Sequence, residues 1–209
     1  GIHESQSRFY ENIIGRSRAF CSIIYPWLKE HFAPRLDHVT EDDFYRMINK
    51  SEPSLIRTEA DELTYCLHIM VRYELEKRMF DGSLTAHDLP AEWNRLYKEY
   101  LGIDVPDDRQ GVLQDSHWAN GNIGYFPSYA IGSAYGAQYL QEMSKDLDVD
   151  AVVRSGDLTP INNWLEDRIW KHGCMKDPVA LFESVCGKFD PACYVAYLEK
   201  KFTEVYGLS

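Results

Sequence analysis

The stretch IRTEADELTYCLHIMVRYELEKRMFDG, residues 56–82, decides the fold. Its apolar residues recur at three- and four-residue steps, which places them on one face of a helix: Leu63, Leu67, Met70, Val71 and Leu75. The Asp81-Gly82 pair follows, and glycine is the residue that most often ends a helix. The sequence therefore predicts a long helix from about Thr58 to Phe80.

Helical patterns also mark the segments on either side of this stretch. Thr40 and Asp43 form a capping pair ahead of an apolar run. Thr159, Asp177 and Asp190 each stand just before a proline, which is the arrangement expected where a helix begins. The apolar residues near the N-terminus have helical spacing as well: Phe9, Ile13, Phe20, Ile23, Ile24, Trp27 and Leu28. The sequence therefore predicts a mainly α-helical, multi-helix body.

Two short stretches, residues 55–57 and 111–114, have strand-like composition and can pair as a small β-sheet. Between residues 102 and 129 the helical periodicity lapses into a loop rich in Gln, Asp, His, Trp and Tyr. A loop this long is more often functional than idle. No internal repeat or linker divides the chain, so we expect a single domain over residues 1–209 with at most this small sheet.

The composition is that of a globular protein, with 44% apolar, 13% aromatic and 26% charged residues. The formal net charge of -11 is spread along the sequence, which argues against a nucleic-acid partner held by a basic patch. No apolar run approaches the roughly 20 residues needed to cross a membrane. Five cysteines without a CxxC pair argue against a disulfide framework or a thiolate zinc site. We expect a cytoplasmic protein.

The first cluster of chemically capable residues is HESQSR, residues 3–8. It places an imidazole, a carboxylate and a guanidinium at the opening of a helix. A charged and capped first helical turn has the same composition, because Ser, Glu and Gln are favoured there. Taken alone, the cluster favours that structural interpretation.

The second cluster is IRTEADE, residues 56–62, in which Arg57 precedes three carboxylates. Acids in a first helical turn complement the helix dipole, so a structural role explains the carboxylates. Arg57 is explained less well. Its forked guanidinium suits a carboxylate, which can be one of these acids or the free end of a peptide.

The third cluster is GVLQDSHW, residues 111–118, followed by GYFPSY at residues 124–129. A histidine and tyrosines on glycine-punctuated loops can donate hydrogen bonds to a developing oxyanion. The aromatic residues can equally attach a loop to the core. His117, close to Asp115, is the residue that this structural interpretation explains least.

Taken together, the three clusters resemble a family. HESQSR, IRTEAD and GVLQDSHW are similar to the signatures HES(Q), IRxxAD and GxxQDxHW of the Taq-type metallocarboxypeptidases, and they occur in the family's order. Each motif alone is a weak signal, but the three in order are specific, and the similarity extends across the whole chain. The resemblance implies the multi-helix body of a helical metallopeptidase, with any small β-sheet near the active-site cleft.

The resemblance also implies a metal ligand. In this family one divalent metal is held by two histidines of an HExxH helix and by the glutamate of the HES signature, here Glu4. His3 and Gln6 would then lie beside the site and orient its ligands. Zinc is the metal expected first, with cobalt or manganese as alternatives, because carboxylate and imidazole ligands suit several ions.

Substrate-facing roles follow from the other two motifs in the same way. Arg57 would recognise the C-terminal carboxylate of a peptide substrate, with Gln114 and Asp115 also in the substrate-binding pocket. His117, with Tyr125 or Tyr129, would polarise the scissile carbonyl and stabilise the tetrahedral intermediate. The catalytic candidates are therefore His117, Tyr125 and Tyr129.

One family feature is missing from this sequence. An HExxH helix needs two histidines four residues apart, but His3-Glu4 is followed by Ser7 where the second histidine would stand. The family's HPF and DxRxT signatures are absent as well. We therefore expect the chain to be the C-terminal portion of the carboxypeptidase catalytic domain, with the missing N-terminal part of the same enzyme as its partner. The resemblance also implies a homodimer when full length.

These expectations lead to two hypotheses of different classes. In the first, the parent protein releases C-terminal amino acids from peptides by metal-dependent hydrolysis, and this part alone is inactive because one carboxylate does not make a catalytic metal site. The metal would then be absent from this part by itself. In the second, the chain is a noncatalytic helical module that binds peptides or a partner. The three-motif resemblance favours the enzyme.

Overall fold

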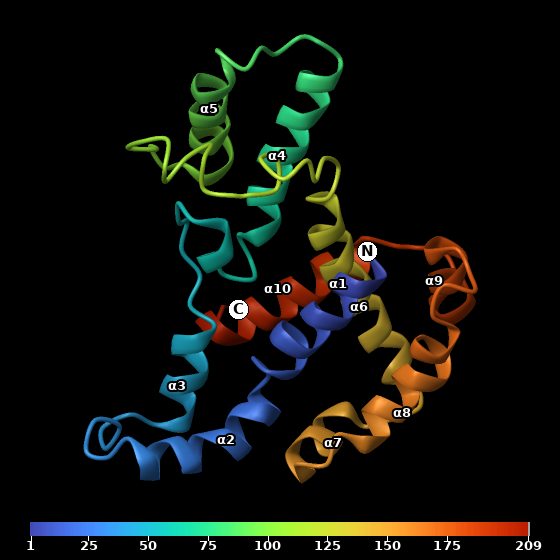
Figure 1. The fold of residues 1–209 in the computed structure, drawn as a ribbon. Coiled ribbons are helices and arrows are strands. Elements are labelled where there is room, and N and C mark those ends of the chain that lie inside the picture. The colour runs from blue at the N-terminus through green and yellow to red at the C-terminus, as the bar shows by residue number, and fades with distance from the viewer. Residues whose placement is uncertain (209) are drawn as a thin grey trace. The chain divides into compact units, whose positions relative to one another are not determined.

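The computed structural model describes residues 1–208, and every regular element among them is a helix (Figure 1). This confirms the mainly α-helical prediction. The α-helices are α1 (Ile2–Arg8), α2 (Arg18–His31), α3 (Glu41–Ile48), α4 (Tyr65–Phe80), α5 (Leu89–Leu101), α6 (Pro127–Met143), α7 (Val149–Ser155), α8 (Thr159–Arg168), α9 (Pro178–Cys186) and α10 (Ala192–Tyr206). A π-helix, η1 (Phe9–Ile14), and two 3₁₀ turns, η2 (Arg57–Glu59) and η3 (Trp170–His172), complete the set.

The chain forms two compact units. Unit 1 contains residues 1–50 and the chain from Ile131 onward, and unit 2 contains residues 51–130. Helix α6 begins in the last residues of unit 2 and continues into unit 1. The single domain over residues 1–209 stays a prediction.

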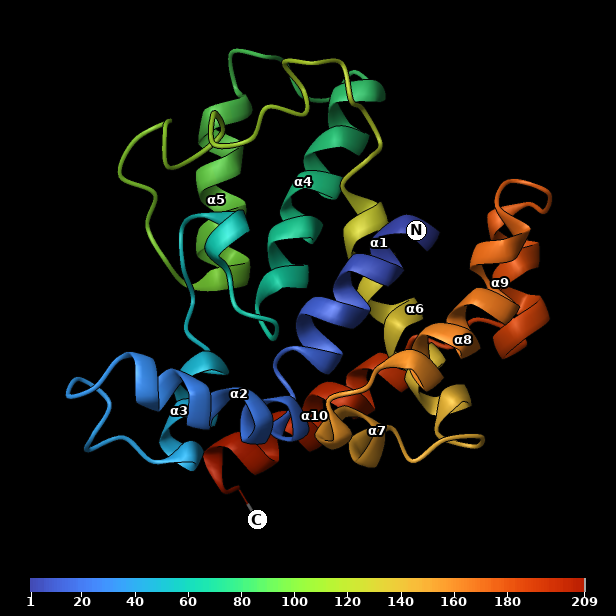
Figure 2. The same ribbon diagram turned by 60° about the horizontal axis from the view of Figure 1, so that its bottom comes forward.

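In unit 1, α1 runs directly into the π-helix η1, and α2 contacts both α3 and α7 (Figure 2). The main core of this unit gathers residues from η1, α6, α7, α8 and α9. Its fully buried members include Phe9, Tyr139, Met143, Ile161, Leu165 and Phe182. Burial of aromatic and aliphatic side chains of this size is the main source of its stability.

Helices α1 and α6 approach each other closely within unit 1. A Cβ atom added to Gly132 would lie 2.6 Å from Cβ of Glu4 and 2.9 Å from the backbone nitrogen of Ser5. Only a glycine leaves room for this approach, because the neighbouring atoms belong to backbone or to the first side-chain carbon. The absence of a side chain at Gly132 therefore sets the position of the helix turn that carries Glu4.

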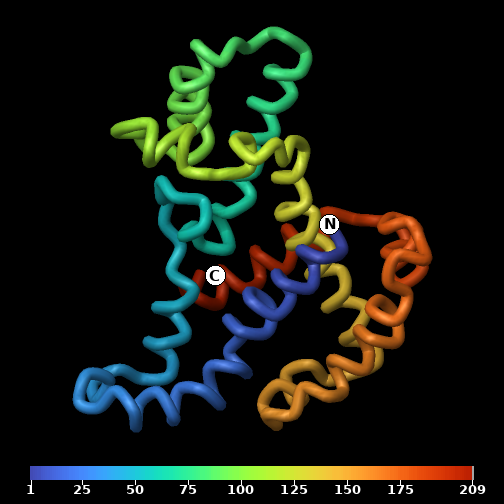
Figure 3. The backbone as a smooth tube through the Cα atoms, in the orientation of Figure 1, coloured from blue at the N-terminus to red at the C-terminus, as the bar shows by residue number. Residues whose placement is uncertain are grey.

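In unit 2, α4 packs against α5 around an apolar cluster. The cluster is built on Val71 and Leu75 from α4 and on Trp93, Leu96 and Tyr97 from α5. After α5, residues 102–126 form turns and coil until α6 begins (Figure 3). This connection contains the GVLQDSHW motif, so the loop predicted to be functional is packed against a helical pair.

Two details of the predicted long helix are wrong. Helix α4 begins at Tyr65 rather than at Thr58, because the Asp61 carboxylate accepts the backbone N–H groups of Leu63 and Thr64 and starts the helix there. The predicted apolar face is also displaced, since Leu63 and Met70 are 40% and 46% exposed. The buried face includes polar side chains instead: Tyr65, His68, Arg72 and Glu76.

The predicted small β-sheet is wrong for the described residues, 1–208, which contain no strand. Arg57 opens the 3₁₀ turn η2, and the stretch at 111–114 folds into turns. The backbone N–H of Leu113 donates to the carbonyl of Asp108, and that of Gln114 to the carbonyl of Gly111. Local turn hydrogen bonds therefore take the donors that a strand pairing would need.

The predicted helix starts are confirmed in part. Thr40 and Asp43 form a reciprocal capping box at α3, and the Asp177 side chain caps α9. Asp190 accepts the backbone N–H of Ala192. The prediction for Thr159 is wrong, because Thr159 is itself the first residue of α8 and the preceding residue makes no side-chain cap.

None of the helices within residues 1–208 has both the length and the apolar character needed to cross a membrane.

Candidate functional site

The centre of the site in unit 2 is Asp115, whose carboxylate lies between two arginines. Arg57 donates from Nε and Nη2 to Oδ1 at 2.9 and 2.6 Å. Arg72 donates from Nε to Oδ2 at 2.6 Å, and its Nη2 lies 2.5 Å from the same oxygen. The Asp115 side chain is 9% exposed and that of Arg72 is 0% exposed, so this is a buried ion triad.

Gln114 links the same two arginines to the backbone of Leu55 and Gln110. Its amide oxygen accepts the backbone N–H of Arg57 at 2.8 Å and Nη2 of Arg72 at 2.9 Å. Its amide nitrogen donates to the carbonyls of Leu55 and Gln110, both at 3.0 Å. The side chain of Gln114 therefore connects η2, α4 and the loop through hydrogen bonds.

Charge pairing controls the ionisation of the triad. Burial alone would raise the pKa of Asp115, but hydrogen bonds from Arg57 and the charge of Arg72 outweigh it, so the pKa lies below its ordinary value. Arg72 is also placed 4.6 Å from the centre of the Trp93 ring, and Arg57 4.9 Å from that of Tyr129. Asp115 is therefore ionised at neutral pH, in a cage of cations and aromatic rings.

His68 and Tyr97 extend this polar network into the helical pair. His68 Nδ1 and the Tyr97 hydroxyl are 3.1 Å apart, and that hydroxyl donates to the carbonyl of Leu55 at 3.1 Å. Burial and the nearby charge of Arg72 lower the pKa of His68 to about 4. His68 is therefore a neutral, fully buried histidine at physiological pH.

His117 lies at the aromatic edge of the site. Its Nε2 shares a hydrogen bond of 2.9 Å with the Tyr129 hydroxyl, and its ring centre lies 4.4 Å from that of Phe126. Nδ1 is buried without a hydrogen-bond partner, 3.9 Å from Oδ1 of Asp115. Burial and the charge of Arg57 lower the pKa of His117, so the imidazole is neutral near pH 7. A neutral imidazole can donate a hydrogen bond from one nitrogen and accept one at the other.

Tyr125 and Tyr129 are not equivalent neighbours of His117. Tyr129 makes the hydrogen bond just described. Tyr125 has its ring centre 5.9 Å from that of His117 and is 40% exposed. The two rings meet edge to face, with centres 5.3 Å apart. Both tyrosines predicted from the sequence therefore lie beside His117, one hydrogen-bonded to it and one more open to solvent.

Glu76 binds both ends of the loop that runs from Trp118 to Gly124. Its Oε1 accepts the indole N–H of Trp118 at 2.8 Å and the backbone N–H of Gly124 at 3.2 Å. Glu76 is 5% exposed and lies on α4. The loop that follows His117 is therefore fastened to the same helix that carries Arg72.

Unit 2 thus gathers five of the predicted residues in one network. Arg57, Gln114 and Asp115 form its ionic part, and His117 and Tyr129 form its aromatic part. Their roles in catalysis or substrate binding stay predictions.

Sequence reasoning missed four polar residues of this network: His68, Arg72, Glu76 and Tyr97. Three of them follow one another at four-residue intervals, so they share one helix face. Their spacing indicates one polar face on this helix. Because charged residues are rarely buried unless they are paired, such a face predicts charged partners elsewhere in the chain if it is buried. The helix prediction rested on the apolar residues of the same stretch, so this polar face was not recognised.

In unit 1, Glu4 is half-buried on α1, and its Oε2 accepts a hydrogen bond from the Ser7 hydroxyl at 3.1 Å. His3 is exposed. Gln6 donates from its amide nitrogen to the Ser5 hydroxyl at 2.9 Å, and its amide oxygen accepts the indole N–H of Trp170 at 2.8 Å. The roles of Glu4, His3 and Gln6 at a metal stay predictions.

A catalytic zinc-type site usually needs three protein ligands. Within the described part of the chain, 1–208, no group of three His, Cys, Asp or Glu side chains could hold a metal ion. A carboxylate such as that of Glu4 is a suitable donor for a divalent metal. The residues described here nevertheless do not fit a complete catalytic metal site by themselves.

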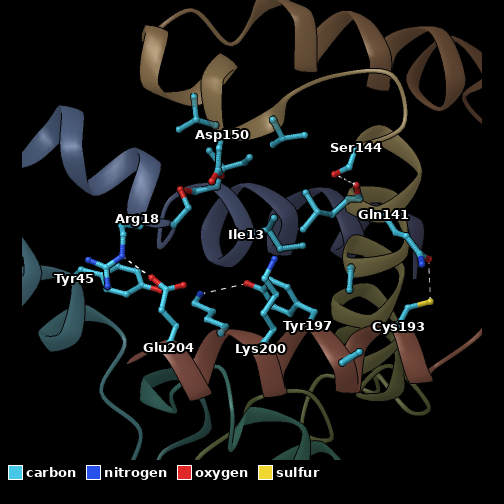
Figure 4. A pocket seen from close by; sticks show the side chains of 18 residues that line it. Ile13, Arg18, Tyr45, Gln141, Ser144, Asp150, Cys193, Tyr197, Lys200 and Glu204 are labelled. Atoms are coloured by element: carbon cyan, nitrogen blue, oxygen red, sulfur yellow. Dashed lines mark hydrogen bonds and ion pairs between the residues drawn. The ribbon is translucent and has the colours of Figure 1, made fainter. Parts of the chain in front are cut away.

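Unit 1 also contains a pocket of about 550 Å³, lined by residues from η1, α2, α3, α6, α7 and α10 (Figure 4). Arg18 reaches Glu204 at 2.6 Å along its edge, and the Cys193 thiol donates to Gln141 at 3.2 Å. None of the site residues predicted from the sequence lines this pocket.

Comparison with known proteins assigns this chain to a family. A model of the family described as Carboxypeptidase Taq (M32) metallopeptidase matches residues 1–202. The chain is 46% identical over 208 residues to Carboxypeptidase 1 of Bacillus subtilis strain 168 and covers 42% of that protein. It is 44% identical over 209 residues to Thermostable carboxypeptidase 1 of Thermus thermophilus and covers 41% of it. Each match takes in 99% of this chain.

The crystal structure of the M32 carboxypeptidase from Deinococcus radiodurans R1 superposes with a TM-score of 0.95 at 39% identity, over all of this chain and 42% of that one. The helical fold is therefore that of the solved relative. The chain belongs to the Carboxypeptidase Taq (M32) metallopeptidase family, and it spans about two fifths of the length of the relatives it matches. Membership of a metallopeptidase family implies a divalent metal.

Proposed function

We propose that the protein to which this chain belongs is a metal-dependent carboxypeptidase that releases C-terminal amino acids from peptides. The observation that carries this proposal is the family match over residues 1–202, together with relatives that are named carboxypeptidases. Two of the three ordered motifs, IRTEAD and GVLQDSHW, support it, because their residues meet in one buried network in unit 2 rather than being scattered over the surface.

In this proposal His117 and Tyr129 act on the scissile carbonyl. The pair is supported by its hydrogen bond of 2.9 Å and by the lowered pKa of His117, which keeps the imidazole neutral. A neutral donor beside a phenol can hydrogen-bond an oxygen that becomes negative in the transition state, and such donors are a large catalytic term. Tyr125, more exposed than Tyr129, is the alternative partner for substrate.

Arg57 is proposed to recognise the substrate's terminal carboxylate. A guanidinium has five N–H donors. Arg57 uses three in its bonds to Asp115 and Tyr65, which leaves one on each terminal nitrogen. The pocket roles proposed for Gln114 and Asp115 are to hold Arg57 in this orientation.

Glu4 is proposed as one ligand of a divalent metal, with zinc expected first and cobalt or manganese as alternatives. Its other ligands would come from outside this 209-residue chain, since no group of three ligating side chains occurs among residues 1–208. By the same reasoning the 209-residue chain would not turn over peptides on its own. Homodimerisation stays a prediction from the resemblance, and a cytoplasmic location stays a prediction from the composition.

The test is an assay of the full-length protein for release of the last amino acid from an N-terminally blocked peptide. We expect release that a chelator abolishes and added metal restores. Replacing the proposed ligand, Glu4→Gln, should lower turnover at least about 100-fold and weaken metal binding measured by calorimetry. The matched control is Glu11→Gln, which removes a carboxylate of the same type that pairs with Arg8 on the surface.

The control should keep the activity and metal affinity of the wild type. A well-folded, metal-supplemented full-length protein that released no amino acid but still bound peptides would reject the enzyme and favour the noncatalytic binding module.

A further inference from the structure

Arg72 lies outside all three family motifs, yet it contacts the centre of the predicted site. We infer that Arg72 is a positioning residue for the proposed hydrolysis. Arg72 lies on helix α4 and binds the carboxylate of Asp115, and it thereby holds the loop that carries His117. This inference rests on the proposed function, since His117 is assigned there to the scissile carbonyl.

The contacts of Arg72 use its whole guanidinium. Nε and Nη2 reach Oδ2 of Asp115 at 2.6 and 2.5 Å, and Nη2 also donates to the amide oxygen of Gln114 at 2.9 Å. Nη1 donates to the carbonyl of His68, one turn earlier on the same helix, at 2.8 Å. One side chain therefore ties two consecutive loop residues to the helix backbone, which a lysine ammonium could not do with the same geometry.

Burial rules out a direct role with substrate in this arrangement. Arg72 is 0% exposed, and its guanidinium lies 4.6 Å from the centre of the Trp93 ring and 5.3 Å from that of Phe126. A residue enclosed in this way acts through its neighbours. The neighbour that leads toward the proposed chemistry is Asp115.

The path from Asp115 to His117 is short. Arg72 holds Oδ2, so the orientation of the carboxylate is fixed and Oδ1 faces Arg57 and His117. Nδ1 of His117, buried and without a hydrogen-bond partner, lies 3.9 Å from this Oδ1. His117 follows Asp115 by two residues, so a rotation or shift of Asp115 would also move the backbone that sets the imidazole against Tyr129.

The experiment compares Arg72→Lys and Arg72→Met in the full-length protein, with Arg78→Met as the matched control. Arg78 lies on the same helix but pairs with Glu92, away from the network. We expect Arg72→Lys to keep the fold and to lower kcat about 10- to 100-fold, with a smaller change in KM, because misplacing a catalytic group slows the chemical step. Arg72→Met should lose at least as much, and Arg78→Met should keep wild-type kcat and KM.

A second readout does not depend on turnover. The imidazole signals of His117 in NMR spectra should shift in Arg72→Lys and stay in place in Arg78→Met, because only the first change releases Asp115. If the wild type showed no peptidase activity, the proposed function would fail, and the NMR comparison would still decide whether Arg72 positions His117. Unshifted His117 signals in folded Arg72→Lys, or activity lost only in proportion to folded protein, would overturn the inference.

Discussion

At the scale of single residues, the main finding is that Arg57 has its carboxylate partner 58 residues further along the chain. The sequence indicated that Arg57 suits a carboxylate and left open whether this was a neighbouring acid or a substrate. The structure pairs it with Asp115, which also binds Arg72. A single sequence reports residue type and local spacing, but not which distant charges meet. Five residues of the network were therefore predicted from the sequence, whereas the other four and the pairing of the charges were not.

The buried triad leads to a prediction about stability. Asp115→Asn keeps the shape of the side chain but leaves two buried guanidiniums without their shared anion. Removing one partner of a buried ion pair destabilises proteins by about 3–5 kcal/mol, and we expect a loss in that range. Chemical denaturation monitored by circular dichroism measures it.

The control for this prediction is Asp42→Asn. Asp42 also binds two arginines, Arg18 and Arg46, but its side chain is 49% exposed. Exposed pairs contribute little, so this variant should unfold close to the wild type. Equal losses in the two variants would mean that burial of the triad is not what makes Asp115 important.

At the scale of elements, helix periodicity predicted where helices occur better than where they begin or which face they bury. Helix α4 was expected from its apolar steps, but Asp61 delays its start to Tyr65. Its buried face holds a polar row because Arg72 is paired with Asp115 and Glu76 binds the loop. Long-range pairing therefore overrode the local pattern in α4. The predicted strands were replaced for a different reason, because local turn hydrogen bonds take the donors that strand pairing would need.

The crossing of α1 and α6 gives a prediction at this scale. Gly132→Ala would place a methyl group 2.6 Å from Cβ of Glu4 and 2.7 Å from its carbonyl carbon, so the helices must move apart. We expect a loss of about 1–3 kcal/mol in the free energy of unfolding, the usual cost of overpacking, although alanine is the better helix former. Urea unfolding measures the change.

Gly136→Ala is the matched control on the same helix. Its added Cβ would meet Ile13 at 3.4 Å and the Ser5 carbonyl at 3.6 Å, which are ordinary contacts. We expect this variant to be unchanged or stabilised by up to about 1 kcal/mol from helix propensity. If Gly132→Ala were as stable as Gly136→Ala, the close approach would not determine the position of Glu4.

At the scale of the whole molecule, family membership followed from three short motifs, whereas the division into two compact units did not. Residues 51–130 separate two parts of unit 1 in the sequence, and no change of composition marks either junction. Each unit closes its own apolar core, and such closure depends on contacts between distant segments. Motif spacing could not supply that information.

The neutral buried histidine makes the stability of the molecule depend on pH. His68 takes up a proton near pH 6.5 when the chain is unfolded, but only near pH 4 when it is folded, because burial and the charge of Arg72 lower its pKa. The unfolded state therefore binds more protons between these values. The free energy of unfolding should fall as the pH drops from about 6.5 to about 4, by an amount on the order of 3 kcal/mol from this group.

Below that pH window Asp115 causes a second fall in the free energy of unfolding. Its lowered pKa stabilises the folded state at pH values above the ordinary pKa of Asp, and this contribution disappears as the carboxylate is protonated. Unfolding by urea at a series of pH values separates the two groups. His68→Leu should reduce the slope between pH 6.5 and 4, with part of it remaining because the pKa of His117 is lowered as well, and should leave the lower limb. The exposed-histidine control His87→Leu should retain the full slope. A His68→Leu profile as steep as that of the control would show that another group titrates in this window.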